Sequence, residues 1–120
     1  MKKILPILLL CAVACELDTQ QLTGRWRAIA LYEGGQTVPA PLDSVSLQFS
    51  ENGSYRFGTI GFYREEGPFR VAGKHLFLTD TTAKTPKERT LEVLFLSNDT
   101  LKLRMEKGGS EQVLFLEKLK

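Results

Sequence analysis

The sequence is poor in cysteine and histidine, and it has no apolar run long enough to cross a membrane. Its 120 residues include two cysteines and one histidine. A zinc site needs three or four Cys, His or carboxylate ligands at set spacing, so we expect no metal site and no cofactor. The longest apolar run, Ile4 to Ala14, has eleven residues, whereas a transmembrane helix needs about 20. A permanent transmembrane helix is therefore not expected.

The sequence also lacks a large excess of charge of either sign. Lysine and arginine total 16, aspartate and glutamate total 14, and the formal net charge is +2. Lys2 and Lys3 account for the excess. Phosphate backbones are bound by clustered basic residues, and a neutral domain without such a cluster is not predicted to bind nucleic acid.

The N-terminus has the pattern of a secretory signal peptide. A short basic segment, Met1-Lys2-Lys3, precedes the apolar run, which ends in the small-residue site Ala12-Val13-Ala14. This order of a basic, an apolar and a small-residue segment directs export and cleavage. We expect residues 1–14 to be the signal peptide.

Cleavage there would leave Cys15 as the first residue, and Cys11 would be lost, so no intramolecular disulfide is expected. A cysteine at this place resembles the bacterial lipoprotein signal, although Ala12 stands where leucine is usual. The resemblance implies lipidation of Cys15 with palmitate among the acyl chains, residues 15–21 as a polar tether, and attachment to the membrane of the bacterial cell envelope. Glu16 after the cysteine is compatible with the outer membrane. The alternative is a secreted or periplasmic chain.

From residue 22 onward the apolar period is two, which is typical of β-strands. Val45, Leu47 and Phe49 alternate with polar residues, and Asn52-Gly53 then gives a strong hairpin signal. We expect further turns at 65–68, 72–74, 98–99 and 107–110, a bulge near Gly58 or Gly61, and loops at 33–42 and 80–87. The fold class predicted for residues 22–120 is all-β, an antiparallel up-and-down meander of eight or nine strands.

Whether such a meander closes into a barrel decides whether its two edge strands are paired. An open meander leaves two unpaired edge strands, whereas an up-and-down barrel pairs them all. A sandwich with Greek-key crossings needs longer connections than most of those seen here. We therefore expect a small eight-stranded barrel.

Several segments carry a resemblance to a known family. They are Leu22 to Trp26 with its Gly24-Arg25-Trp26 element, Phe49 to Tyr55, Glu66 to Val71 and Lys74 to Leu78. Together they resemble the lipocalin-like domains of bacterial envelope lipoproteins, which are calycin-type barrels. The resemblance implies that Trp26 plugs the closed end, where Gly24 lets the chain pass close, and that a cation from Arg104 or Lys118 stacks on the indole. It also implies that the loop at 33–42 lies over the open mouth.

An eight-stranded barrel can be filled by side chains or hold one small ligand. We expect eight inward aromatic residues to occupy most of the interior: Trp26, Tyr32, Phe49, Tyr55, Phe57, Phe69, Phe95 and Phe115. Any cavity should then be small and lie near the mouth. Tyr32, Tyr55 and Tyr63 are the candidate ligand contacts, because each has an apolar ring and a polar tip.

Catalytic groups are poorly represented. His75 has no nucleophile motif nearby, and Glu65 and Glu66 are expected in a solvated turn, where they would not form a paired acid and base. We predict a protein without enzymatic activity that binds a small, largely apolar ligand in the cell envelope. The alternative is an interaction or structural module whose barrel is filled and whose loops meet a protein partner not identifiable from the sequence.

Overall fold

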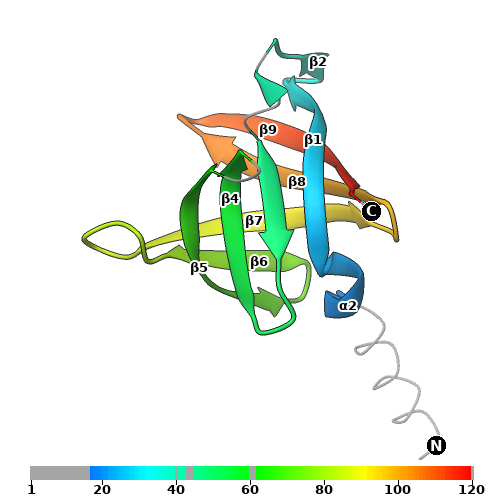
Figure 1. Cartoon of the computed structure of the whole chain (residues 1–120). Coiled ribbons are helices and arrows are strands. Elements are labelled where there is room, and N and C mark those ends of the chain that lie inside the picture. The colour runs from blue at the N-terminus through cyan, green and yellow to red at the C-terminus, as the bar shows by residue number, and fades with distance from the viewer. Residues whose placement is uncertain (1–16, 40, 43–44, 60–61, 120) are drawn as a thin grey trace, which may run out of the picture.

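The strands form one closed barrel. The computed structural model describes residues 17–39, 41–42, 45–59 and 62–119; the predicted signal peptide and Cys15 lie outside them. The sheet order is β2-β1-β3-β4-β5-β6-β7-β8-β9, every pairing is antiparallel, and β9 pairs back onto β1 (Figure 1). The bounds are β1 Gly24–Glu33, β2 Gln36–Thr37, β3 Ser46–Phe49, β4 Ser54–Thr59, β5 Phe62–Ala72, β6 His75–Asp80, β7 Lys87–Leu96, β8 Thr100–Lys107 and β9 Ser110–Lys118. The predicted eight-stranded up-and-down barrel is confirmed, and β2 is a short extra strand.

Among the described residues, a helix of one turn precedes the barrel. Helix α2 spans Thr19–Leu22, and the side chain of Asp18 caps it by accepting from the Gln20 amide at 2.9 Å. Leu22 at its end is fully buried. In Figure 1 the helix lies at the base of β1. Within the described ranges, no helix has the length and hydropathy required to traverse a bilayer.

The bulges in the β1–β9 and β7–β8 pairings change which residues face the interior. The pairing of β1 with β9 shifts between Ala28 and Ala30, and that of β7 with β8 shifts between Val93 and Phe95. A bulge inserts one residue, and one residue reverses the in-and-out alternation beyond it. Leu31 consequently lines the interior beyond the first bulge.

The expectation that eight aromatic residues fill the barrel is wrong. The tilted rings of Tyr32 and Phe115 are in contact, with centroids 5.0 Å apart, and Lys102 lies over both Phe115 and Phe95 on the outer wall. Phe95 is 48% exposed. The bulges explain Tyr32 and Phe95, and in β9 the inward positions belong to the buried Leu114 and Leu116. The interior is accordingly less crowded than its aromatic content suggests.

The turn expected at residues 65–68 is also wrong. Strand β5 runs through Glu65-Glu66-Gly67-Pro68 without interruption. Pro68 pairs with Ser54, the first residue of β4, and the pairing of β5 with β6 begins at the next residue, Phe69. A side chain on Gly67 would place its Cβ 1.9 Å from the Thr79 carbonyl oxygen. The Gly67-Pro68 pair thus does not reverse the chain. Gly67 allows β6 to approach closely, and Pro68 ends the pairing between β4 and β5.

A turn, a bulge and a loop predicted from the sequence are confirmed. The chain turns at Asn52-Gly53 with a positive φ at Gly53 alone, while the Asn52 side chain accepts from the Ser54 amide at 3.1 Å. A bulge lies between Phe57 and Gly58, and the loop between β6 and β7 covers residues 81–86.

Candidate functional site: a cavity at the mouth of the barrel

Trp26 closes one end of the barrel. Its side chain is fully buried, and its indole Nε1 donates to the Leu22 carbonyl at 2.8 Å. The Lys118 ammonium lies 5.0 Å from the ring centroid and donates to the Gln21 carbonyl at 2.8 Å. Helix α2 and the C-terminal strand therefore converge on one indole, and we call this region the closed end.

Gly24 makes room for that convergence. Its φ is +137°, and a Cβ at this position would lie 3.3 Å from Cε of Lys118. Few L-residues adopt that φ. Of the two cations considered for the indole, Lys118 occupies the place, whereas Arg104 pairs with Glu92 and Glu111. The Gly24-Arg25-Trp26 element thus has a steric basis.

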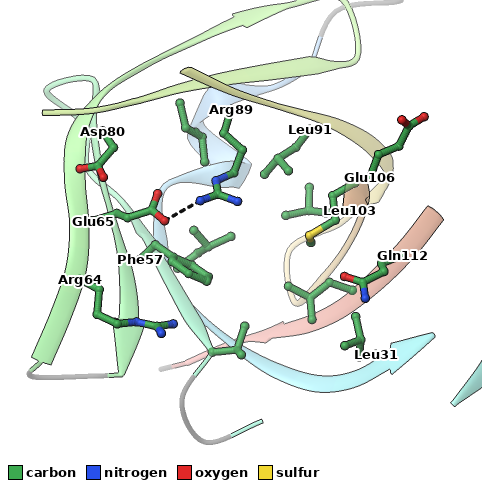
Figure 2. Close-up of a pocket in the computed structure, with 15 residues that line it drawn as sticks. Leu31, Phe57, Arg64, Glu65, Asp80, Arg89, Leu91, Leu103, Glu106 and Gln112 are labelled. Atoms are coloured by element: carbon green, nitrogen blue, oxygen red, sulfur yellow. Dashed lines mark hydrogen bonds and ion pairs between the residues drawn. The ribbon is translucent and has the colours of Figure 1, made fainter. Parts of the chain in front are cut away.

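A cavity of about 610 Å³ occupies the opposite end, which we call the mouth. All eight barrel strands or their flanks contribute to its wall. Figure 2 shows its lining residues converging from several strands. The apolar part consists of Leu31, Val45, Leu47, Phe57, Leu78, Leu91, Leu103, Met105 and Leu114.

Charged and polar residues gather where the cavity meets solvent. Arg64, Glu65, Asp80 and Arg89 come from β5, β6 and β7 on one side. Glu106 and Gln112 come from β8 and β9 on the other side. The cavity is thus apolar below and charged at its rim, an arrangement suited to one small amphipathic molecule.

Glu65 is the most enclosed of these charges. Its side chain is 16% exposed and accepts from Arg89 at 2.6 Å through Oε2. The buried Tyr55 hydroxyl donates to Glu65 Oε1 at 3.2 Å. Burial, followed by the neighbouring Glu65 charge, raises the pKa of Tyr55 well above its ordinary value. Tyr55 therefore remains a neutral donor beneath a charged pair.

Asp80 is held by the loop that follows it. Its Oδ1 accepts from both the amide of Thr82, at 2.9 Å, and the Thr82 hydroxyl, at 2.6 Å. These hydrogen bonds lower the pKa of Asp80. The carboxylate is thus ionised at neutral pH, and one of its oxygens is occupied by the protein's own donors.

Arg64 reaches the cavity because of the bulge opposite Gly58. In the β4 and β5 pairing, Phe57 faces Glu65 and Gly58 faces Tyr63, so Arg64 is the extra residue. Its guanidinium carbon lies 5.3 Å from the centroid of the Phe57 ring. Figure 2 shows the side chain extending beside Phe57. The bulge therefore directs two consecutive residues, Arg64 and Glu65, to the cavity.

The structure disperses the three tyrosines expected to contact ligand. Tyr55 points inward and reaches the cavity wall through Glu65. Tyr32 lies on the outer wall against Phe115. The Tyr63 hydroxyl donates to Gln48 Oε1 at 3.3 Å, and the exposed Arg56 lies 5.6 Å from its ring, which places Tyr63 outside the barrel. Their role as ligand contacts stays a prediction.

The sequence reasoning missed Arg64, Glu65 and Arg89 as cavity residues. The Gly67-Pro68 pair suggested a turn and hid the strand. Extending the alternation of Phe69 and Val71 back through Gly67 would have placed Glu65 inward. Arg89, two residues before the buried Leu91, follows the same rule. Arg64 had no such signal, because a bulge is not visible in the alternation.

The described residues contain no group of three or more His, Cys, Asp or Glu placed to hold a metal ion. His75 is exposed and lies beside Phe77, with ring centroids 6.4 Å apart. The cavity therefore offers apolar contact, hydrogen bonding and charge.

Comparisons with known proteins bear on the fold. No family model matches the sequence, and no curated protein matches it. Among solved structures, the chain is similar to a lipocalin-like protein from Bacteroides uniformis ATCC 8492, with a TM-score of 0.61 and 21% identity. The match covers 82% of this chain and 99% of that one. This chain therefore has the lipocalin-like fold, as its Gly24-Arg25-Trp26 element and meander predict.

Proposed function

We propose that this protein binds a small, largely apolar ligand in its barrel, and that it does so in the bacterial cell envelope. The cavity of about 610 Å³ with its apolar wall carries the proposal. Small-molecule pockets commonly have about 300–1,000 Å³ and mostly apolar walls with a few polar groups. The lipocalin-like fold agrees with a ligand-binding role.

The alternative, a module with a filled barrel, is less well supported. It requires the inward aromatic residues to occupy the interior, but Tyr32, Phe95 and Phe115 lie outside. Trp26 and Phe49 lie toward the closed end, and Phe57 forms part of the cavity wall. Space is left at the mouth, and this space favours ligand binding.

Filling the cavity tests the proposal. Met105 lines it, and we expect Met105→Trp to reduce affinity for the neutral fluorescent probe N-phenyl-1-naphthylamine at least about tenfold, because the indole occupies the probe's volume. Thr90→Trp is the matched control, since Thr90 is exposed and pairs with Phe77, outside the cavity. Unchanged affinity in Met105→Trp, or no probe binding by the wild type, would reject the cavity as the site.

The identity of the natural ligand requires protein from its own host. Native mass spectrometry of that preparation should show a mass in excess of the polypeptide and its acyl chains, and the excess should be absent in Met105→Trp. An identical spectrum for the two proteins would count against a resident ligand.

The envelope location rests on the N-terminal sequence. We expect radiolabelled palmitate to be incorporated into the wild type and not into Cys15→Ala. Cys11→Ala is the control, because Cys11 would be removed with the signal peptide, and it should label normally. Labelling that persists in Cys15→Ala would contradict lipid anchoring at this residue.

A further inference from the structure

One outer wall of the barrel carries a row of side chains in register across four strands. Phe95 in β7 pairs with Lys102 in β8. Lys102 also pairs with Phe115 in β9, which in turn pairs with Ala30 in β1. Residues that are directly paired on neighbouring strands lie on the same face of the sheet, and Phe95 is half exposed. The whole row therefore faces outward.

The two bulges extend this row with further apolar side chains. Ile29 in β1 and Leu94 in β7 are the extra residues of the bulges, and they are 47% and 45% exposed. Tyr32 adds its ring beside Phe115. We call this surface the outer patch, and it consists of Ile29, Tyr32, Leu94, Phe95, Lys102 and Phe115. Of the four large apolar side chains that are exposed in the described part of the chain, three belong to it.

The charges that border the outer patch are paired with one another. Arg27 pairs with Glu117 on the side of the closed end, and Arg104 pairs with Glu92 on the side of the mouth.

Lys102 is the one formal charge inside the patch. Its ammonium lies 4.6 Å from the Phe115 ring centroid and 5.7 Å from that of Phe95, and it forms no ion pair with a described carboxylate. Aromatic rings favour the boundary between a bilayer and water, where a lysine can keep its stem on apolar surface and its ammonium near the lipid phosphates. The outer patch thus has the composition of a surface that contacts lipid head groups.

The predicted lipid anchor lies close to this wall. Leu17 packs against the core of the barrel, and the two residues of chain from Cys15 to Leu17 span at most about 7 Å. Gln21 in α2 donates to the side chain of Asn98 at 3.2 Å. Asn98 belongs to the turn that directly follows the strand of Phe95. Acyl chains on Cys15 would therefore hold this end of the outer patch within reach of the membrane surface.

We propose that the outer patch rests on the membrane in which Cys15 is anchored, with its apolar side chains among the lipid head groups and the Lys102 ammonium beside lipid phosphates. This inference rests on the proposed envelope location and goes beyond it, because it assigns the wall of the barrel that faces the bilayer. An acyl anchor limits the distance between a protein and the membrane, and apolar side chains at the interface supply the second contact that fixes its orientation. The wall across the barrel, formed by β4 and β5, then faces water.

Quenching of fluorescence by brominated lipids tests this contact. Lipidated protein carrying Phe95→Trp is reconstituted in vesicles of phosphatidylethanolamine and phosphatidylglycerol that have bromine on the upper carbons of their acyl chains. We expect the added indole to lose about half of its emission, because aromatic rings at a bilayer surface lie at the level of the head groups. The wild type supplies the background, since its single tryptophan, Trp26, is fully buried.

Tyr63→Trp is the matched control. Tyr63 in β5 is also an outward aromatic ring with a cation over it, because Arg56 in β4 lies 5.6 Å from its centroid. In the closed sheet order, β4 and β5 lie across the barrel from β8 and β9. We expect the indole of Tyr63→Trp to be quenched by acrylamide in the water and not by brominated lipid.

A charge placed in the outer patch should release it from the membrane. Leu94→Glu, combined with Phe95→Trp, should reduce the quenching by brominated lipid at least about twofold, because a carboxylate loses hydration at the interface. Thr90→Glu is the control, since Thr90 is an exposed residue of the same strand outside the patch, and it should leave the quenching unchanged. Circular dichroism verifies that each variant is folded.

The two proposals fail in different ways. If the wild type incorporates palmitate and floats with the vesicles, but Phe95→Trp is quenched by acrylamide and not by brominated lipid, the anchor stands and the membrane contact is overturned. If neither quencher reaches this indole, a second copy or another protein covers the patch, and the membrane contact is again overturned. If the wild type neither incorporates palmitate nor floats with the vesicles, the envelope location fails, and this inference fails with it.

Discussion

The two ends of this barrel are made from the same strands and have opposite properties. At the closed end, Trp26, Leu22, Leu101 and Leu116 are all fully buried. At the mouth, Phe57 and Met105 are half-buried beside a cavity, and charged residues replace aliphatic ones. Helix α2 supplies a plug at one end, whereas at the other end the bulge in β1 turns Tyr32 to the outer wall and leaves the smaller Leu31 beside the cavity. A packed end can thus hold the fold while the open end leaves space for the proposed ligand.

Truncating a large side chain should give the largest difference between the two ends in the free energy of unfolding. Trp26→Ala removes a fully buried ring together with its hydrogen bond and Lys118 contact, and we expect a loss of about 3–5 kcal/mol in the free energy of unfolding. Phe57→Ala should lose less than half as much, because Phe57 already borders open space. Urea denaturation measures both, and equal losses would contradict the division into two ends.

Enlarging a side chain should also destabilise the closed end more than the mouth. Leu101→Phe overpacks the closed end, and we expect it to cost about 1–3 kcal/mol. Met105→Phe enlarges a residue beside the cavity and should leave the free energy of unfolding nearly unchanged while weakening probe binding. Denaturation and probe titration on the same preparations test the pair, and a large destabilisation by Met105→Phe would mean that the mouth is as tightly packed as the base.

Gly24→Ala probes the backbone at the closed end. The new methyl group would press on Lys118 at 3.3 Å, and φ +137° is strained for alanine, so we expect a cost of about 1–3 kcal/mol. Gly35, also at positive φ but with open space around it, is the control for strain without contact. Gly35→Ala should cost less, and a cost equal to that of Gly24→Ala would remove the role assigned to Lys118.

The smallest effect concerns acid stability at the mouth. The pKa of Asp80 is lowered in the folded state by Thr82, so its contribution is present above the unfolded pKa of about 3.9 and is lost as the pH falls through the folded value. We expect Thr82→Val to lower the free energy of unfolding at pH 7, and the gap from wild type to close below pH 3. Carboxyl NMR titration should show the pKa of Asp80 moving up.

Thr81→Val is the control for that titration, because the Thr81 hydroxyl donates to the Glu66 carbonyl instead. It should leave the pKa of Asp80 in place. An Asp80 pKa insensitive to Thr82 would show that the loop does not hold the carboxylate.

Alternation and turn residues were sufficient to predict the barrel. Val45, Leu47 and Phe49 alternate with polar residues, and Asn52-Gly53 lies at a real turn. Trp26 and Gly24 could be assigned to the closed end from one short motif. The site was less predictable, because Gly67-Pro68 has the composition of a turn, and only the neighbouring β6 shows that the glycine serves a close approach.

By itself the sequence determined the all-β class, the up-and-down order and the position of Trp26, because hydrophobic period and turn chemistry are local properties of the chain. Only the tertiary structure decided which aromatic rings lie inside, and that Arg64, Glu65 and Arg89 meet at the mouth. A bulge depends on how two strands pair, and one inserted residue reverses every side chain beyond it. The content of the barrel is therefore a property of paired strands and cannot be read from any one of them.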